Sequence, residues 1–207
     1  MRRSSILYSI IKWLAQGVFA FFYRIETETK DLSPCDGPAV ILPKHQYWTD
    51  IPLVSLSFRF PLLFVAKREL FRYPGMRTFL SLLGGVPLDR EQSIRTLNSF
   101  KYLLSRLKAA EKIVIFPEGT YFRGAVGSGK SRLVRMILRF QTKSGQRIPF
   151  IPVGIRYGGR DGWRRRVEVC IGSPLFAERE ADAIVLIHRV MQNISQMCQL
   201  PQTKIQI

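Results

Sequence analysis

Short apolar runs bounded by proline or glycine recur along the chain and predict buried strands. They are PAVILP (38–43), PLLFVA (61–66), GGVPL (84–88), KIVIFP (112–117) and IPFIPVGIRY (148–157). Continuous apolar runs of this length are typical of strands that are covered on both faces. Between them, the pattern predicts helices near residues 50–58, 69–82, 91–110, 129–143 and 177–198. This alternation predicts an α/β fold with a mainly parallel central sheet flanked by helices.

One segment departs from the alternation and predicts an antiparallel pair of strands. In VGIRYGGRDGWRRRVEVCIG, two apolar stretches flank the letters GGRDG. Glycine and aspartate favour tight turns, so we expect a hairpin joined through GGRDG. The basic run 164–166 could contact nucleic acid, but short basic runs usually face solvent or lipid.

The N-terminal stretch is the most hydrophobic part of the chain and predicts a helix. Residues Ile6 to Tyr23 make 18 mostly apolar positions, about the lower limit for crossing a bilayer. Polar positions recur there at spacings of four, three and four, on one helical stripe: Ser5, Ser9, Lys12 and Gln16. A narrow polar stripe suits a helix that lies in the membrane interface. A short transmembrane helix and a secretory signal are alternatives, although Lys12 interrupts the apolar run.

These patterns predict two regions and no internal repeat. Residues 1–28 form an amphipathic, membrane-associated helix, and residues 29–207 form a single α/β domain. Lys and Arg number 32 against 15 Asp and Glu, so the net charge is +17. A field of this sign attracts nucleic acid, phosphorylated substrates or an anionic membrane surface. The three cysteines are far apart and histidines number two, so we expect reduced thiols and no metal site.

The segment PKHQYWTDIP contains a pair of residues that could act as a general base. His45 follows a strand, and Asp50 precedes Pro52, which favours the first turn of a helix. With His45 in the loop and Asp50 at the helix start, the chain can fold back and pair them. Asp50 would then fix the imidazole tautomer and leave the other ring nitrogen as a base. The alternative is a surface histidine beside a helix-capping aspartate.

Four blocks in order resemble the glycerophospholipid acyltransferase family, typified by 1-acylglycerol-3-phosphate acyltransferases. They are H-x4-D at 45–50, a glycine-rich strand leading to Arg90, FPEGT at 116–120, and the proline-containing strand IPFIPVGI at 148–155. The resemblance covers roughly residues 36–175. It implies the α/β domain given above and an O-acyltransferase activity.

The resemblance also implies roles for individual residues. His45 deprotonates a glycerol hydroxyl, Asp50 orients His45, and the oxygen attacks an acyl thioester without an acyl-enzyme. The donor is acyl-ACP or acyl-CoA, and no cofactor takes part. The acceptor and its phosphate are bound by Arg90, Lys67, Glu118, Gly119, Thr120 and Arg123, and the acyl side is shaped by Pro152 and Val153.

The acceptor implied is a lysophospholipid, in the first place 1-acylglycerol-3-phosphate, at the cytoplasmic face of a membrane. Two departures put another lysolipid forward as an alternative. Tyr47 stands where the family commonly has a small hydroxyl residue, and Tyr121 stands where Arg or Ser commonly follows the threonine. Both His45 and Asp50 are present, which argues against an inactive member of the family.

Residues 124–131, GAVGSGKS, fit the phosphate-binding loop pattern G-x-x-x-x-G-K-[ST]. Such a loop leaves a strand directly and opens a helix. A helix can follow here, but PEGTYFR separates the preceding strand from Gly124. We therefore expect a mobile loop beside the acceptor pocket, with Lys130 adding positive charge. An ATPase and a nucleic-acid-binding module are distant alternatives.

Overall fold

The computed structural model describes residues 5–30, 37–73, 77, 85–88 and 94–203. The predictions for Arg90 and for most of the second half of the helix 69–82 lie outside these residues. The helices are α1 (Ser5–Phe22), α2 (Asp50–Ser57), α4 (Ile94–Lys108), α5 (Ser131–Ser144) and α6 (Ala183–Cys198). Short 3-10 turns are η1 (Arg68–Arg72) and η2 (Glu180–Asp182).

The strands form one sheet in the order β1-β7-β6-β2-β5-β3-β4. Their bounds are β1 (Tyr23–Thr29), β2 (Ala39–Pro43), β3 (Leu62–Lys67), β4 (Gly85–Leu88), β5 (Lys112–Val114), β6 (Phe150–Asp161) and β7 (Arg164–Ile171). Neighbouring strands are parallel except β6 and β7, which form an antiparallel hairpin. The predicted α/β fold with a mainly parallel sheet is confirmed.

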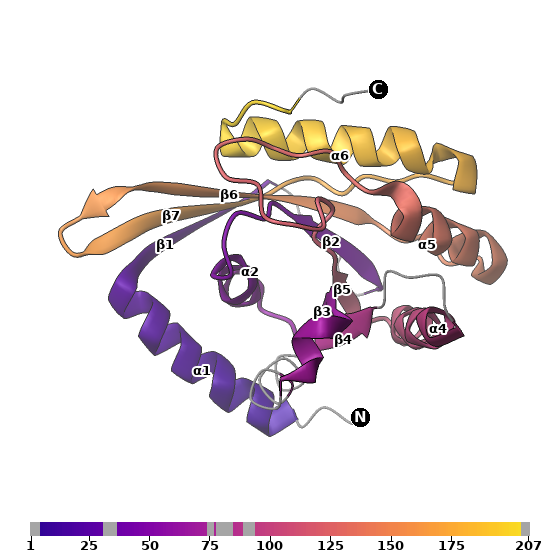
Figure 1. Cartoon of the computed structure of the whole chain (residues 1–207), viewed down its shortest axis with the longest axis horizontal. Helices are drawn as coiled ribbons and strands as arrows, with labels where there is room; N and C mark the ends of the chain where they lie inside the picture. The colour runs from indigo at the N-terminus through magenta and orange to yellow at the C-terminus, as the bar shows by residue number, and fades with distance from the viewer. Residues whose placement is uncertain (1–4, 31–36, 74–76, 78–84, 89–93, 204–207) are drawn as a thin grey trace.

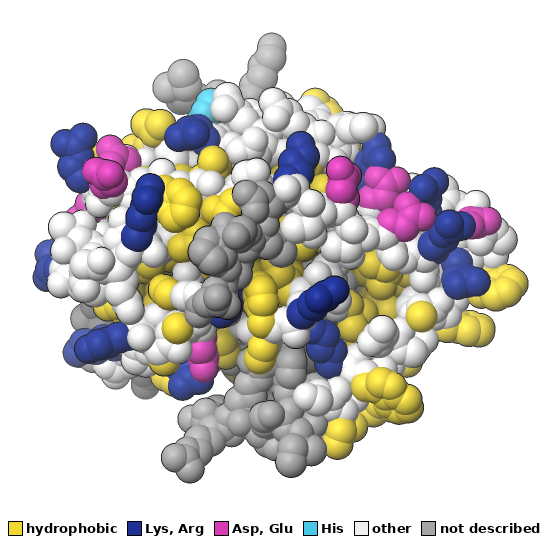
Figure 2. All heavy atoms as spheres, turned by 180° about the vertical axis from the view of Figure 1, so that it is seen from behind, with side chains coloured by type: hydrophobic (Ala, Val, Ile, Leu, Met, Phe, Trp, Pro, Cys, Tyr) yellow, Lys and Arg dark blue, Asp and Glu magenta, His cyan; other side chains and the backbone are white. Residues whose placement is uncertain are grey.

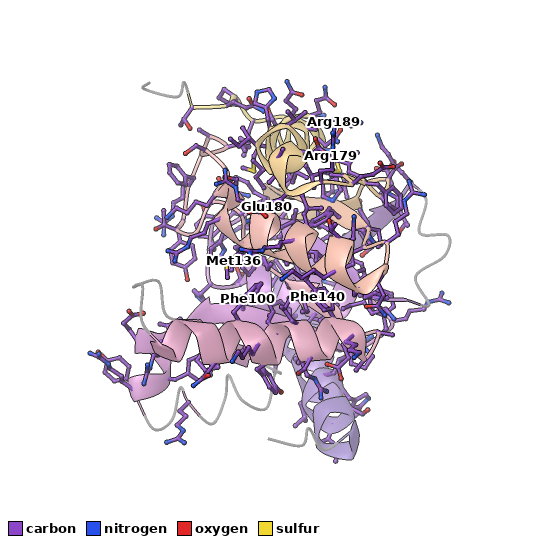
Figure 3. All side chains as sticks on the ribbon, turned by 90° about the vertical axis from the view of Figure 1, so that its right-hand side faces the viewer. Phe100, Met136, Phe140, Arg179, Glu180 and Arg189 are labelled. Carbon is purple, nitrogen blue, oxygen red and sulfur yellow. The ribbon has the colours of Figure 1, made fainter. Side chains whose placement is uncertain are left out.

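Helices cover both faces of this sheet (Figure 1). On one face, α4, α5 and α6 pack over a core that includes Val40, Leu42 and Phe150. In Figure 3, Phe100 of α4 lies beside Met136 and Phe140 of α5, between the two helices. On the other face, α1 and α2 contribute a second apolar cluster. All five residues of β2 are buried, which explains the uninterrupted apolar letters of that strand.

The structure corrects two expectations at the edge of the sheet. Residues 23–28, assigned from sequence to the N-terminal helical region, belong to β1, which pairs in parallel with β7. Its sequence YRIETET is too polar to resemble the buried strands. The turn of the hairpin takes in only the last residue of GGRDG, because β6 runs through Gly158 and Gly159 to Asp161. The turn is Gly162–Trp163, and the φ of 63° at Gly162 suits glycine.

Among the described residues, no helix combines the length and the apolarity needed to cross a membrane.

Gly154 of β6 lies so close to α6 that a side chain has no room. A Cβ atom there would lie 2.5 Å from Cβ of Met197 and 3.3 Å from Sγ of Cys198. We expect Gly154→Ala to lower the free energy of unfolding by about 1 to 3 kcal/mol, because overpacking forces the helix away from the strand. Urea unfolding followed by circular dichroism measures this change.

The matched control is Gly159→Ala in the same strand, where no atom lies within 4 Å of the new Cβ. Its free energy of unfolding should change by less than about 0.5 kcal/mol. Equal losses in the two variants would contradict the packing argument.

Candidate active site

The loop from β2 to α2 brings His45 and Asp50 together. Nδ1 of His45 lies 3.1 Å from Oδ2 of Asp50. Asp50 is the first residue of α2, and its side chain is fully buried, whereas the His45 side chain is 12% exposed. The strand end and helix start therefore place a buried carboxylate against a partly accessible imidazole.

Three further donors hold the Asp50 carboxylate. Oδ2 accepts hydrogen bonds from the backbone N–H groups of Gln46 at 2.5 Å and Tyr47 at 2.7 Å. Oδ1 accepts a hydrogen bond of 2.6 Å from the hydroxyl of Tyr157 in β6. Burial, together with the adjacent Asp50 carboxylate, raises the pKa of Tyr157 above its ordinary value, so this hydroxyl remains a donor. Both oxygens of the Asp50 carboxylate are thus held by hydrogen bonds.

This arrangement sets the tautomer of His45. An aspartate carboxylate accepts hydrogen bonds, so Nδ1 of His45 carries the proton and donates it. The other ring nitrogen, Nε2, forms no hydrogen bond with any described residue and keeps its lone pair. A neutral imidazole oriented in this way can accept a proton from a substrate hydroxyl.

Two aromatic rings from the loop after β5 hold the imidazole plane. The Phe116 ring stacks on the His45 ring with centroids 3.9 Å apart, and the Tyr121 ring lies 4.3 Å away at a tilt. The backbone N–H of Phe122 donates a 2.9 Å hydrogen bond to the carbonyl of His45. Tyr121, one of the two departures from the family pattern, therefore contacts the candidate base itself.

The carboxylate of Glu118 is buried beneath the site, and the acceptor-binding role that the resemblance implies for this residue stays a prediction. Only 1% of Glu118 is exposed, and its oxygens lie 2.8 Å and 3.0 Å from Nζ of Lys44, which is also fully buried. Oε2 also accepts the backbone N–H of His45 at 2.8 Å, and Oε1 accepts that of Gly127 at 2.7 Å. Glu118 therefore holds the backbone of His45 in place through a hydrogen bond.

Sequence reasoning missed Lys44 and Tyr157. Lys44 follows an apolar strand directly and precedes His45, and its ammonium also donates a 2.7 Å hydrogen bond to the carbonyl of Phe122. No sequence pattern identified Tyr157, because it lies 107 positions from Asp50 and reaches it only through the sheet. A lysine directly after a buried strand is a sequence signal for a buried ion pair, because lysine is seldom buried without a partner.

The remaining predicted residues lie in different environments. The exposed guanidinium of Arg123 lies 4.8 Å from the ring centroid of Tyr47. Gly119 has a φ of 70° in the turn after Phe116, and Thr120 is exposed. Lys67 is the last residue of β3. Pro152 and Val153 are buried in β6, beside Leu42 and Pro43 of β2.

Arg165 of β7 joins this group although no motif pointed to it. Its guanidinium lies 5.1 Å from the ring centroid of Tyr157 and 6.0 Å from that of Tyr47. Two arginines, Arg123 and Arg165, thus stack on aromatic rings next to His45 and Asp50. Such guanidinium groups can bind phosphate or carboxylate while the rings hold them in place.

The GAVGSGKS segment is bound to the protein rather than shaped around a phosphate. The N–H of Gly127 is taken by Glu118, and the N–H of Lys130 donates to the carbonyl of Pro117 at 2.9 Å. A Cβ at Gly127 would lie 2.6 Å from the Phe122 ring, and one at Gly129 would lie 2.7 Å from Ile187. Close packing therefore explains these two glycines. The exposed Lys130 lies immediately before α5.

Among the described residues, no group of three or more His, Cys, Asp or Glu side chains could hold a metal ion.

Comparison with known proteins identifies relatives of one kind. A chloroplastic 1-acyl-sn-glycerol-3-phosphate acyltransferase of Arabidopsis thaliana is 33% identical over 121 residues, which are 57% of this chain and 33% of that protein. A 1-acyl-sn-glycerol-3-phosphate acyltransferase of Bacillus subtilis is 30% identical over 97 residues, 46% of this chain and 48% of that one. A lyso-ornithine lipid O-acyltransferase of Brucella abortus is 32% identical over 100 residues, 48% and 36% of the two chains.

The matched region is a third to about half of the length of these relatives. The crystal structure of the 1-acyl-sn-glycerophosphate acyltransferase of Thermotoga maritima shares the fold, with a TM-score of 0.63 at 24% identity, over 95% of this chain and 81% of that one. The family model for acyltransferases matches residues 24–156, which include His45, Asp50 and Glu118 but end before Tyr157 and Arg165. The chain therefore belongs to the acyltransferase family.

Proposed function

We propose that this protein is an O-acyltransferase that moves a fatty acyl chain from acyl-ACP or acyl-CoA to the free hydroxyl of a lysophospholipid. The proposed acceptor is 1-acylglycerol-3-phosphate and the product phosphatidic acid. The observation that carries the proposal is the His45–Asp50 contact of 3.1 Å, which leaves Nε2 of His45 as a base. The names of the relatives in Arabidopsis thaliana and Bacillus subtilis support this acceptor.

In the proposed reaction, Nε2 of His45 takes the proton of the acceptor hydroxyl as its oxygen attacks the thioester carbonyl. The new C–O bond forms, the C–S bond breaks, and the leaving thiolate takes the proton from the imidazolium. The buried Asp50 carboxylate stabilises the imidazolium while it exists. Cys198 is no candidate for a covalent intermediate, because burial raises its pKa to about 12.

The acceptor head group is proposed to lie against Arg123 and Arg165. Both guanidinium groups are held over the ring of Tyr47, next to the loop that carries His45. A phosphate accepts paired, charge-assisted hydrogen bonds from such groups. The residues predicted from the resemblance, Arg90 and Lys67, remain proposed phosphate ligands.

A second candidate acceptor is a lysolipid with another head group. Tyr121 contacts the ring of His45, and the ring of Tyr47 lies beneath the guanidinium of Arg123. Both tyrosines depart from the family pattern. The name of the Brucella abortus relative, which acts on a lyso-ornithine lipid, supports this alternative. Bulky phenol rings at the acceptor side would favour a head group that differs in shape from a bare phosphate.

The membrane is proposed to meet the molecule at α1. The Lys12 ammonium points toward the protein and donates a hydrogen bond to the carbonyl of Phe58. The large apolar side chains on the other side of the helix are exposed: Ile10, Trp13, Leu14, Val18, Phe21 and Phe22. A helix with an outward apolar face suits the interface of an anionic bilayer, and we place it at the cytoplasmic face.

Mass spectrometry of the reaction products tests the proposal. The purified full chain is incubated with a panel of lysolipids, each with acyl-ACP or with acyl-CoA. Formation of phosphatidic acid from 1-acylglycerol-3-phosphate is the expected result, and formation of a different diacyl lipid favours the second candidate. Failure to acylate any lysolipid with either donor would overturn the proposed function.

Tyr157→Phe removes one donor to Asp50 without changing the shape of the side chain. We expect kcat to fall about three- to tenfold, because one hydrogen bond to a charged group is lost, while KM for the acceptor changes little. Steady-state kinetics over a range of pH measures both constants. Tyr102→Phe in α4, an exposed tyrosine whose ring lies beside Arg106, is the control and should behave as wild type. Equal kinetics for Tyr157→Phe and wild type would contradict the positioning role.

A further inference from the structure

The tip of the β6–β7 hairpin carries an exposed aromatic residue among arginines. Trp163, at the turn, is 69% exposed. Arg164 lies with its guanidinium 5.6 Å from the Trp163 ring centroid, and Arg160 and Arg165 are close by in the two strands. None of these three arginines forms an ion pair with another described residue. The tip therefore presents uncompensated positive charge around one large apolar side chain.

This tip is fastened to the end of α1. Nε1 of Trp163 donates a 3.1 Å hydrogen bond to the carbonyl of Phe21, and Arg24 pairs with Asp161 at 2.8 Å. The parallel pairing of β1 with β7 continues the attachment, with Tyr23 opposite Arg165. Figure 1 shows the hairpin tip and the C-terminal end of α1 on the same side of the molecule. A surface that binds this side of the molecule would therefore contact both the hairpin tip and the end of α1.

We propose that the hairpin tip is a second membrane-binding element, which inserts Trp163 into the interface of an anionic bilayer beside α1. The indole N–H is already bonded to Phe21, so the ring can enter the apolar boundary without leaving a donor unpaired. Arg160 and Arg164 then lie at the level of the lipid phosphates. The inference rests on the membrane association proposed above and extends it to a segment outside the N-terminal helix.

Charge and shape favour a bilayer over other polyanions. The exposed residues of α1 at this end, Phe21 and Phe22, have no use on a nucleic acid, whereas they extend the apolar surface around Trp163. In Figure 2, hydrophobic side chains lie at the right-hand edge, where the tip and the end of α1 lie, with basic and acidic side chains interspersed above them. The aromatic side chains of this surface can enter the apolar part of a bilayer, while the surrounding arginines contact its anionic head groups.

The same contact would bring the candidate active site to the membrane. Arg165 follows the tip and lies over Tyr157, the residue that donates to Asp50. On the α1 side, Phe19 lies edge-on to the exposed Trp48 in the loop that carries His45, with centroids 6.5 Å apart. The site thus lies between the two proposed membrane contacts, where a lysolipid could reach it without leaving the bilayer.

The test compares two double variants of the full chain. Trp163→Ser with Arg164→Ser removes the aromatic–arginine pair at the tip. Phe176→Ser with Arg147→Ser removes a second such pair, 4.2 Å apart, in loops at the other end of β6 and β7. The two variants have the same net charge. Binding is measured by co-sedimentation with vesicles of phosphatidylcholine and phosphatidylglycerol, and with vesicles of phosphatidylcholine alone.

We expect the tip variant to bind mixed vesicles about tenfold more weakly than wild type, and the control variant to stay within about twofold. In Trp13→Phe/Trp48→Phe protein, brominated lipids should quench the fluorescence of the remaining Trp163. Equal binding by the two double variants, or no quenching, would overturn the inference. So would loss of binding to a duplex DNA oligonucleotide with unchanged vesicle binding, which would make the tip a nucleic-acid site.

Acylation of a short-chain lysolipid dissolved below its micelle concentration separates this inference from the proposed function. The tip variant should retain the turnover of wild type there, because its substitutions leave the described site contacts intact. If wild type and both variants are all inactive, the proposed function fails, whereas the vesicle measurements still decide the role of the tip.

Discussion

Replacing His45 by alanine should lower acyl transfer at least about a hundredfold while the protein still folds and binds vesicles. Nε2 of this residue is the base that the proposed reaction requires, and Asp50 fixes its orientation through Nδ1. The small side chain leaves the buried Asp50 with its two backbone donors and the Tyr157 hydroxyl, so the loop keeps its anchors. The measurement is the rate of diacyl product formation by mass spectrometry, with circular dichroism to check the fold.

His188→Ala is the matched control, because His188 is exposed on α6 and has no hydrogen bond, ion pair or ring contact with a described residue of the site. It should keep the rate of wild type. A His45→Ala variant with wild-type kcat would remove general-base catalysis from the mechanism, whatever the rate of the control.

Breaking the buried ion pair beneath the site should have the largest effect on stability. We expect Glu118→Gln to lower the free energy of unfolding by about 3 to 5 kcal/mol, because it leaves the Lys44 ammonium charged and buried without its carboxylate. The amide has nearly the same shape, so the loss measures charge rather than packing. Urea unfolding gives the value, and adding Lys44→Met should recover part of it.

Asp161→Asn is the control for this substitution. It removes the same kind of charge from an exposed pair with Arg24, and its cost should stay below about 1 kcal/mol. Equal costs for the buried and the exposed pair would contradict the role assigned to Glu118. Because Glu118 also accepts the N–H of His45, the variant should lose activity as well.

The sequence predicted what local patterns determine. Buried parallel strands appear as continuous apolar runs, so the central strands and the sheet class could be recognised, and β2 is buried throughout. The pairing of His45 with Asp50 follows from a strand end and a helix start within one short loop. Both features depend on residues that are close together in the chain.

Contacts between distant segments could not be predicted in this way. Lys44 meets Glu118 across 74 positions, and Tyr157 meets Asp50 across 107, so each pairing exists only once the sheet has formed. β1 was missed because its polar letters reflect an edge position, where one side faces solvent. The glycines of GAVGSGKS matched a nucleotide-binding pattern, although two of them are required by the neighbouring Phe122 and Ile187.

The direct passage from α1 to β1 has a mechanical consequence. Phe22 ends the helix and Tyr23 begins the strand, with no linker between them. If α1 binds the membrane as proposed, a flexible linker at this point would let the α/β domain rotate relative to α1 and lie at different heights above the lipid. Because no linker is present, the rotation of α1 about its own axis sets the orientation of the whole sheet. The depth in the membrane at which the site binds a glycerol hydroxyl would then be determined by the backbone itself.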